Sequence, residues 1–174
     1  LCAGADGRVL YLGLRSPMAA GARGGPPRAI AVPLENATDV LERGRAPRFG
    51  APLAWDLGGR AIRDMTYSAR HRALFVLAGS AGDGGGAALY RWSGDPGDAP
   101  ALAGTLEPRW TPEALVAFET RPELLVISDD GAVAVPVARR QECLEDYSPK
   151  KGTCPNKRLA DVERRTFRAR WVAP

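Results

Sequence analysis

The feature that most constrains this chain is a two-strand pattern that occurs three times. In each copy a short strand-like segment and a tight turn precede an apolar segment, and the apolar segments are residues 7–16, 71–80 and 121–131. Each is too short for a buried helix and is rich in branched or aromatic side chains, which favours a β-strand. Their continuous apolar character indicates strands that are covered on both faces. The copies recur at intervals of roughly 50–65 residues, close to the length of one blade of a β-propeller.

Further short strands are predicted between these pairs, and the 20 Gly and 15 Pro residues favour many turns over long helices. The pairs themselves begin with residues 1–3, 62–67 and 113–118, and candidate outer strands are residues 29–34, 52–57, 87–92 and 101–106. A final strand is predicted over residues 166–172, and loops over residues 79–86 and 93–100. One short helical turn is expected near residues 38–44, with Thr38 as its N-cap and Gly44 as its stop.

These elements predict an all-β fold, a partial β-propeller of about three to four blades that is truncated at its N-terminus. Closed propellers have at least four blades, and the chain opens at Leu1 inside a strand-like segment. We therefore expect missing N-terminal blades or a second chain to complete the ring.

Charge divides the chain into two parts. Residues 1–138, the predicted blades, carry a net charge of −1 with no Lys, whereas residues 139–174 carry a net charge of +5. The basic surplus lacks the interleaved aromatic side chains of a nucleic-acid-binding module, so it is interpreted as a solvated segment whose last strand packs on the blades. No apolar run reaches the ~20 residues that a membrane span requires.

Three cysteines bear on the compartment. Cys143 and Cys154 bracket a polar loop that contains Pro149 and Gly152, and a disulfide between them would close that loop in an oxidising compartment. A zinc site is the rival interpretation, but zinc takes four ligands and His71 is the only histidine. A disulfide predicts a secreted or periplasmic protein. Cys2 is then either a small buried apolar group or the partner of a cysteine upstream.

Several short stretches resemble those of an uncharacterised bacterial β-propeller family, a domain of unknown function that is similar to esterase-like and phytase-like propeller proteins. The resembling stretches are residues 12–17, 56–59, 59–65, 89–92 and 112–115. The resemblance covers most of residues 1–135 and implies a propeller fold in a protein longer than this chain, with a glutamate-containing strand just before Leu1. It implies no particular activity. Ala114 departs from the family pattern, which has Gly at this position.

Charged side chains at the strand ends are the candidate functional residues. If the strand pairs stack radially, equivalent positions point to one rim of a central channel, and the residues placed there are Arg15, Arg63, Asp64, Glu113, Asp129 and Asp130. The two guanidinium groups would suit a phosphate or carboxylate ligand. The carboxylates would suit Ca²⁺, with Asp64 and Glu113 as the first candidate ligands. The structural alternative is that Arg and Asp pair with one another where blades meet.

Three functions follow from these residues. The first is a propeller that binds a small anionic or metal-associated ligand at its channel. The second is a metal-dependent hydrolase of the phosphoesterase or lactonase type, in which the metal activates water and arginine stabilises developing charge. The third is a protein-interaction scaffold. Trp55, Trp92, Trp110 and Trp171 are assigned to packing between blades rather than to ligand stacking.

Overall fold

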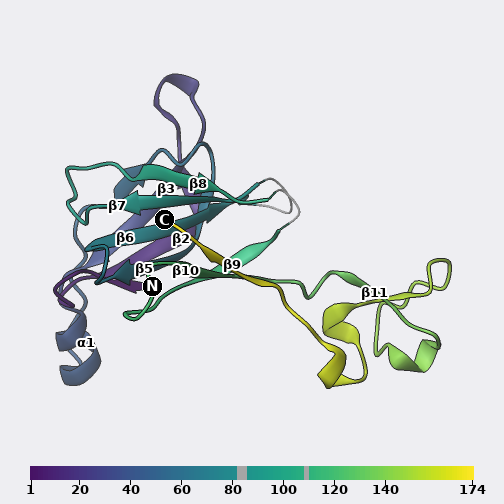
Figure 1. The fold of residues 1–174 in the computed structure, drawn as a ribbon. Coiled ribbons are helices and arrows are strands. Elements are labelled where there is room, and N and C mark those ends of the chain that lie inside the picture. Colours follow the sequence, from purple (N-terminus) through teal and green to yellow (C-terminus); the bar gives the residue numbers. More distant parts are fainter. Residues whose placement is uncertain (82–85, 108–109) are drawn as a thin grey trace.

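The part of the chain that the structure describes is mostly β, with its strands arranged in four antiparallel sheets (Figure 1). The structure is a computed structural model that describes residues 1–81, 86–107 and 110–174. Residues 82–85 of the loop predicted over 79–86 lie outside the described residues. No helix among the residues described is both long and apolar enough to cross a membrane.

The first sheet is an antiparallel meander whose strands follow one another in chain order. Its strands are β1 (Cys2–Ala3), β2 (Leu10–Ala19), β3 (Arg28–Leu34) and β4 (Leu53–Trp55). A 3₁₀ turn, η1 (Ala22–Gly24), lies between β2 and β3. Each strand falls within or beside a segment that the sequence predicts as strand.

The predicted helical turn is present as α1 (Ala37–Arg43), between β3 and β4. Gly44 ends it in the left-handed conformation with φ of 60°, which glycine adopts without steric cost. The prediction of Thr38 as N-cap is wrong, because Asn36 occupies that position. The Asn36 side chain accepts a hydrogen bond from the backbone N–H of Arg48 and donates one to the carbonyl of Ala46, so it ties the helix to the following loop.

The second sheet has the same meander order as the first. Its strands are β5 (Ala61–Ser68), β6 (Ala73–Gly79), β7 (Ala88–Trp92) and β8 (Ala101–Thr105). Every residue of β6 is buried, which confirms that this apolar segment is covered on both faces. In contrast, all residues of β8 except Gly104 are exposed, because β8 is the outer edge of the sheet.

The third sheet has three strands in the order β9, β10, β13. They are β9 (Pro112–Ala117), β10 (Leu124–Ser128) and β13 (Ala169–Val172). β13 is the predicted final strand, and it returns from the C-terminal segment to pair with β10.

Between β10 and β13 the chain forms a small unit that projects away from the three larger sheets (Figure 1). It contains β11 (Ala134–Pro136) paired with β12 (Thr153–Pro155), and three 3₁₀ turns, η2 (Arg140–Glu142), η3 (Asn156–Arg158) and η4 (Val162–Arg164). Val137, Leu159 and the cysteines at 143 and 154 form its own apolar cluster. The unit therefore includes residues on both sides of position 138.

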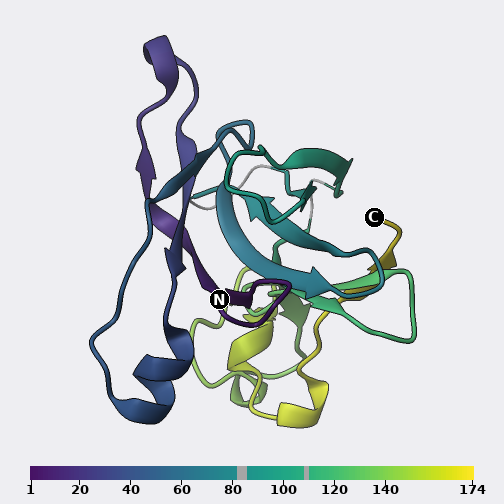
Figure 2. The same ribbon diagram turned by 90° about the vertical axis from the view of Figure 1, so that its left-hand side faces the viewer.

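The second sheet lies between the first and the third, which explains why β6 is apolar on both faces. Alternate β6 residues, among them Leu74 and Val76, join a cluster shared with the first sheet, whereas Phe75 and Leu77 join a cluster shared with the third sheet. Side chains alternate across a strand, so one continuous apolar run fills two cores. The stacking brings β5 against both β2 and β9, the arrangement visible in Figure 2.

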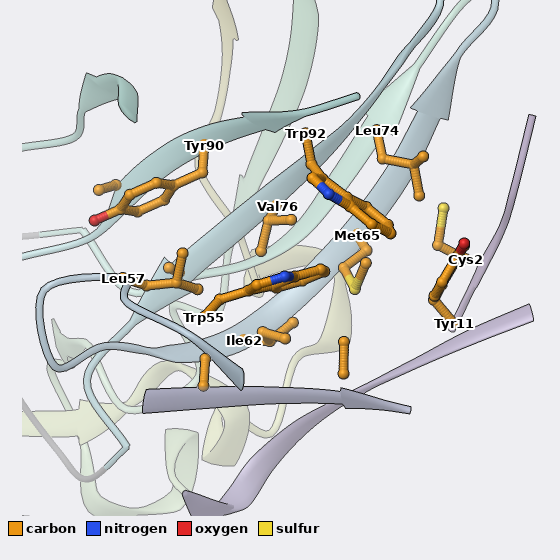
Figure 3. Packing of buried hydrophobic residues seen from close by; sticks show 14 residues of the cluster. Cys2, Tyr11, Trp55, Leu57, Ile62, Met65, Leu74, Val76, Tyr90 and Trp92 are labelled. Atoms are coloured by element: carbon orange, nitrogen blue, oxygen red, sulfur yellow. The ribbon is translucent and has the colours of Figure 1, made fainter. Parts of the chain in front are cut away.

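Aromatic side chains fill the cluster between the first and second sheets (Figure 3). The ring centroids of Trp55 and Trp92 lie 4.8 Å apart, and the Tyr11 ring meets the Trp92 ring edge-on at 5.0 Å. Burial of each large apolar side chain stabilises the fold by about 1.5–3 kcal/mol. Trp55 and Trp92 thus pack between sheets as expected, whereas Trp171 in β13 is 41% exposed.

Candidate functional site

Arg63 on β5 and Glu113 on β9 form an ion pair that joins the second and third sheets. One Arg63 Nη atom donates to Glu113 Oε1, and the other donates to the carbonyl oxygen of Ser80 at 2.6 Å. The Arg63 side chain is 10% exposed and that of Glu113 is 37% exposed. Arg63 is therefore held in place, whereas part of the Glu113 carboxylate faces solvent.

Arg15 on β2, in the first sheet, lies next to the contact between Arg63 and Ser80. Its Nε atom donates to the carbonyl oxygen of Ala81 at 3.4 Å, next to the Ser80 carbonyl that Arg63 contacts. Arg15 is exposed, and no carboxylate among the described residues pairs with it. We call the group of Arg15, Arg63, Ser80, Ala81 and Glu113 the three-sheet junction. Three of the predicted site residues meet there, although they are far apart in sequence.

Asp64 lies beside the junction and connects two strands through its carboxylate. The register of β5 against β6 shifts between Ile62 and Asp64, which marks an irregularity in the ladder. Asp64 Oδ1 accepts from the N–H of Met65 at 2.8 Å, and Oδ2 accepts from the N–H of Leu115 on β9 at 2.8 Å. Both carboxylate oxygens thus have backbone partners, so the side chain positions β9 against β5.

Asp129 and Asp130, at the end of β10, are separated by their environments. Asp129 is exposed, and its carboxylate accepts from the N–H of Gly131. Asp130 is 6% exposed and binds Arg168 through three hydrogen bonds, from the backbone N–H, Nε and Nη2. It also accepts from the hydroxyl of Ser128. The hydrogen bonds from Arg168 hold the pKa of Asp130 below its ordinary value.

Asn156 completes this second group, and no sequence pattern identified it. Its Nδ2 donates to the backbone carbonyls of Asp130 and Thr166, and its Oδ1 accepts from the N–H of Thr166. The side chain is 4% exposed. We call Ser128, Asp130, Asn156, Thr166 and Arg168 the neck, because they join the small unit to the third sheet. Asp130 is thus fully engaged in the neck.

The calcium ligand set expected from the sequence is not assembled among the residues described. No group of three or more His, Cys, Asp or Glu side chains lies together within 1–81, 86–107 and 110–174. Of the two candidate ligands, Asp64 is engaged by two backbone N–H groups and Glu113 by Arg63. The side chains present therefore fit a pairing arrangement better than a Ca²⁺ site, which requires six to eight oxygen ligands.

The cysteines behave as the loop pattern predicts. Cys143 and Cys154 form a disulfide with their Cα atoms 5.6 Å apart, which confirms the predicted pair. Cys2 is buried in the first core cluster with a free thiol. Burial raises the pKa of this thiol to about 11, so it stays protonated and unreactive at neutral pH.

A cavity of about 220 Å³ lies away from the three-sheet junction, between the end of β8 and strand β13. Its lining includes Leu106, Trp110, Arg170 and Val172. None of the predicted site residues lines it. No protein-family model, curated protein or solved structure matches this chain.

Proposed function

We propose that this chain is a binding module of a β-propeller and that the three-sheet junction recognises a small ligand carrying an anionic group. The observation that carries the proposal is the approach of Arg15 and Arg63 to two consecutive carbonyls, with Glu113 beside them. Stacked antiparallel meanders with their early strands in contact support the propeller architecture.

The two arginines have different roles in this proposal. Arg63 is the positioning residue, because Glu113 and the Ser80 carbonyl already fix its guanidinium group. Arg15 is exposed and holds one long hydrogen bond to a neutral carbonyl, so its remaining N–H groups are available to a carboxylate or phosphate. The solvent-facing part of Glu113 would accept a hydrogen bond from a hydroxyl group on the same ligand. A hydroxylated organic acid satisfies both requirements.

The proposal extends to the ring and to the compartment. We propose that further blades or a second chain complete the propeller, because the outer faces of the first and third sheets are not covered by another of the larger sheets described. The Cys143–Cys154 disulfide supports a secreted or periplasmic location, since such bonds persist in oxidising compartments. The hydrolase alternative has no further support, given the carboxylate partners described above.

Calorimetric titration of the full chain with gluconate, and separately with inorganic phosphate, tests the proposal. Arg15→Gln is expected to weaken gluconate binding by about tenfold or more, the value of one charge-assisted interaction. Arg8→Gln is the matched control, an exposed arginine in the preceding turn, and it should bind as the parent chain does. Absence of binding of both probes, or equal binding by Arg15→Gln, contradicts the proposal. Calcium binding that Glu113→Gln removes would favour the metal-dependent hydrolase instead.

A further inference from the structure

β13 is an open sheet edge. The first and second sheets each have four strands, whereas the third has three, with β13 at its outer side. Within the described residues no backbone group of another strand pairs with that side of β13. Such an edge presents a row of hydrogen-bonding groups that suits another extended chain.

The pairing of β13 with β10 determines which peptide groups face outward. The N–H of Ser128 donates to the carbonyl of Arg168 at 2.9 Å. Hydrogen-bonded and non-bonded pairs alternate along an antiparallel ladder, so Arg170 and Val172 direct their N–H and C=O groups toward β10. Ala169 and Trp171 therefore offer theirs to the open side, which places two donors and two acceptors along the edge.

One face of this edge borders the cavity of about 220 Å³ described above. Leu106, Trp110 and Val172 are partly buried there and pack against the core shared by the second and third sheets. Arg170 pairs with Glu107 at 2.8 Å, so the charges at this cavity are balanced. An apolar side chain of an added strand would fit between these walls.

The other face of the edge carries aromatic and positive groups. The ring of Trp171 lies 5.5 Å from that of Phe118, and the guanidinium of Arg121 lies over Trp171 at 4.6 Å. No carboxylate among the described residues pairs with Arg121. This face therefore complements an acidic side chain.

We propose that the open edge of β13 binds an extended acidic segment of a partner protein as a fourth antiparallel strand. Backbone hydrogen bonds to Ala169 and Trp171 supply the pairing, and alternate side chains of the partner divide between the two faces. Apolar residues enter the cavity beside Val172, and acidic residues lie against Arg121. The short edge restricts the contact to about four residues, so the association is weak and sensitive to salt.

The probe is the peptide acetyl-Glu-Val-Glu-Val-Glu-Val-amide, titrated into the full chain by calorimetry and by tryptophan fluorescence. A peptide with Lys in place of Glu, and one with N-methylated glutamates, are its controls, because the residues opposite Ala169 and Trp171 in such a pairing are the glutamates. Ala169→Pro removes one outward N–H without touching the ladder to β10, and it is expected to weaken binding by about tenfold. Arg121→Gln is expected to weaken it by a comparable factor and to reduce its salt dependence.

The inference is overturned if the Glu-Val peptide does not bind, if the N-methylated peptide binds equally well, or if Arg121→Gln has no effect. The N-methylated peptide and the Arg121→Gln variant test the proposal even if Ala169→Pro fails to fold. Sedimentation of the peptide-free chain distinguishes another occupant, because a dimer that Ala169→Pro dissociates would assign the edge to a second copy and contradict the proposal.

Discussion

At the scale of single residues, neighbouring carboxylates have unlike roles although they look equivalent in sequence. Asp129 is exposed, whereas Asp130 is buried and bound to Arg168 and Ser128. The sequence places both at the end of one strand and so predicted one function for the two. The distinction depends on partners that lie far along the chain, and no local spacing reveals it.

Replacing each carboxylate by an amide separates these roles. Asp130→Asn removes the charge that Arg168 binds and leaves fewer acceptors for its donors, so it is expected to lower the free energy of unfolding by about 2 kcal/mol. Asp129→Asn at the adjacent exposed position should change it by less than about 0.5 kcal/mol. Urea denaturation of both variants measures the difference, and equal effects would contradict the assignment of Asp130 to the neck.

The same carboxylate gives stability a defined pH dependence. Hydrogen bonds from Arg168 lower the pKa of folded Asp130 below the ordinary value of 3.8. Its contribution is therefore complete above about pH 5 and is lost as the pH falls through the folded-state pKa. The stability difference between the parent chain and Asp130→Asn should shrink over that acid range. A difference that stays constant from pH 7 to pH 2 would rule out this linkage.

At the scale of elements, the positions of the strands could be predicted from the sequence. For the small unit, the disulfide could be predicted but the neck could not. Apolar runs flanked by Gly and Pro identify strands locally, and β6 shows this most clearly because every residue in it is buried. The disulfide was predictable from its polar loop. The neck was not, because Asp130 meets Asn156 across 26 positions and Arg168 across 38. A buried asparagine carries no periodic signal.

Removing the disulfide is expected to loosen the small unit alone. Cys143 and Cys154 belong to its apolar cluster, and closure of their loop contributes about 3 kcal/mol by chain entropy. In Cys143→Ser/Cys154→Ser, amide hydrogen exchange of residues 134–160 should accelerate while β6 and β7 stay protected. Cys2→Ser, which alters the first core cluster, is the control and should leave that exchange unchanged. Uniform acceleration across the sheets would contradict the independence of the unit.

At the scale of the whole molecule, close stacking of sheets brings the junction residues together. The repeated strand pairs predicted one rim for six residues, namely Arg15, Arg63, Asp64, Glu113, Asp129 and Asp130. The contacts at Ser80 and Ala81 group Arg15, Arg63 and Glu113. Asp130 instead pairs with Arg168 in the neck. The pair of Arg63 with Glu113 agrees with the structural alternative, in which opposite charges pair where blades meet. What the repeat could not predict is the hydrogen bond from the backbone of β9 to Asp64. That hydrogen bond depends on how closely β5 approaches its neighbours.

A substitution at Gly13 on β2 tests how closely the first sheet packs against β5. A Cβ atom at this position would lie 2.5 Å from Ile62 Cγ2 on β5, so the first and second sheets are in contact there. Gly13→Ala is expected to destabilise the fold by about 1–3 kcal/mol through overpacking. Gly104→Ala on the edge strand β8 meets nothing within 4 Å and should change stability little. Thermal unfolding of the two variants provides the comparison, and similar melting temperatures would refute close stacking at Gly13.

The path of the chain through the third sheet has an evolutionary consequence. β10 and β13 are antiparallel neighbours, so the small unit is an insertion in the connection between two paired strands. A tight turn could replace residues 131–166 while β10 and β13 kept their register and the Asp130–Arg168 pair remained at the base. Chain ends that lie close together tolerate such exchange at small entropic cost. We therefore expect relatives of this chain to differ in length mainly between β10 and β13. The segment that corresponds to residues 131–166 should be present or absent as a whole.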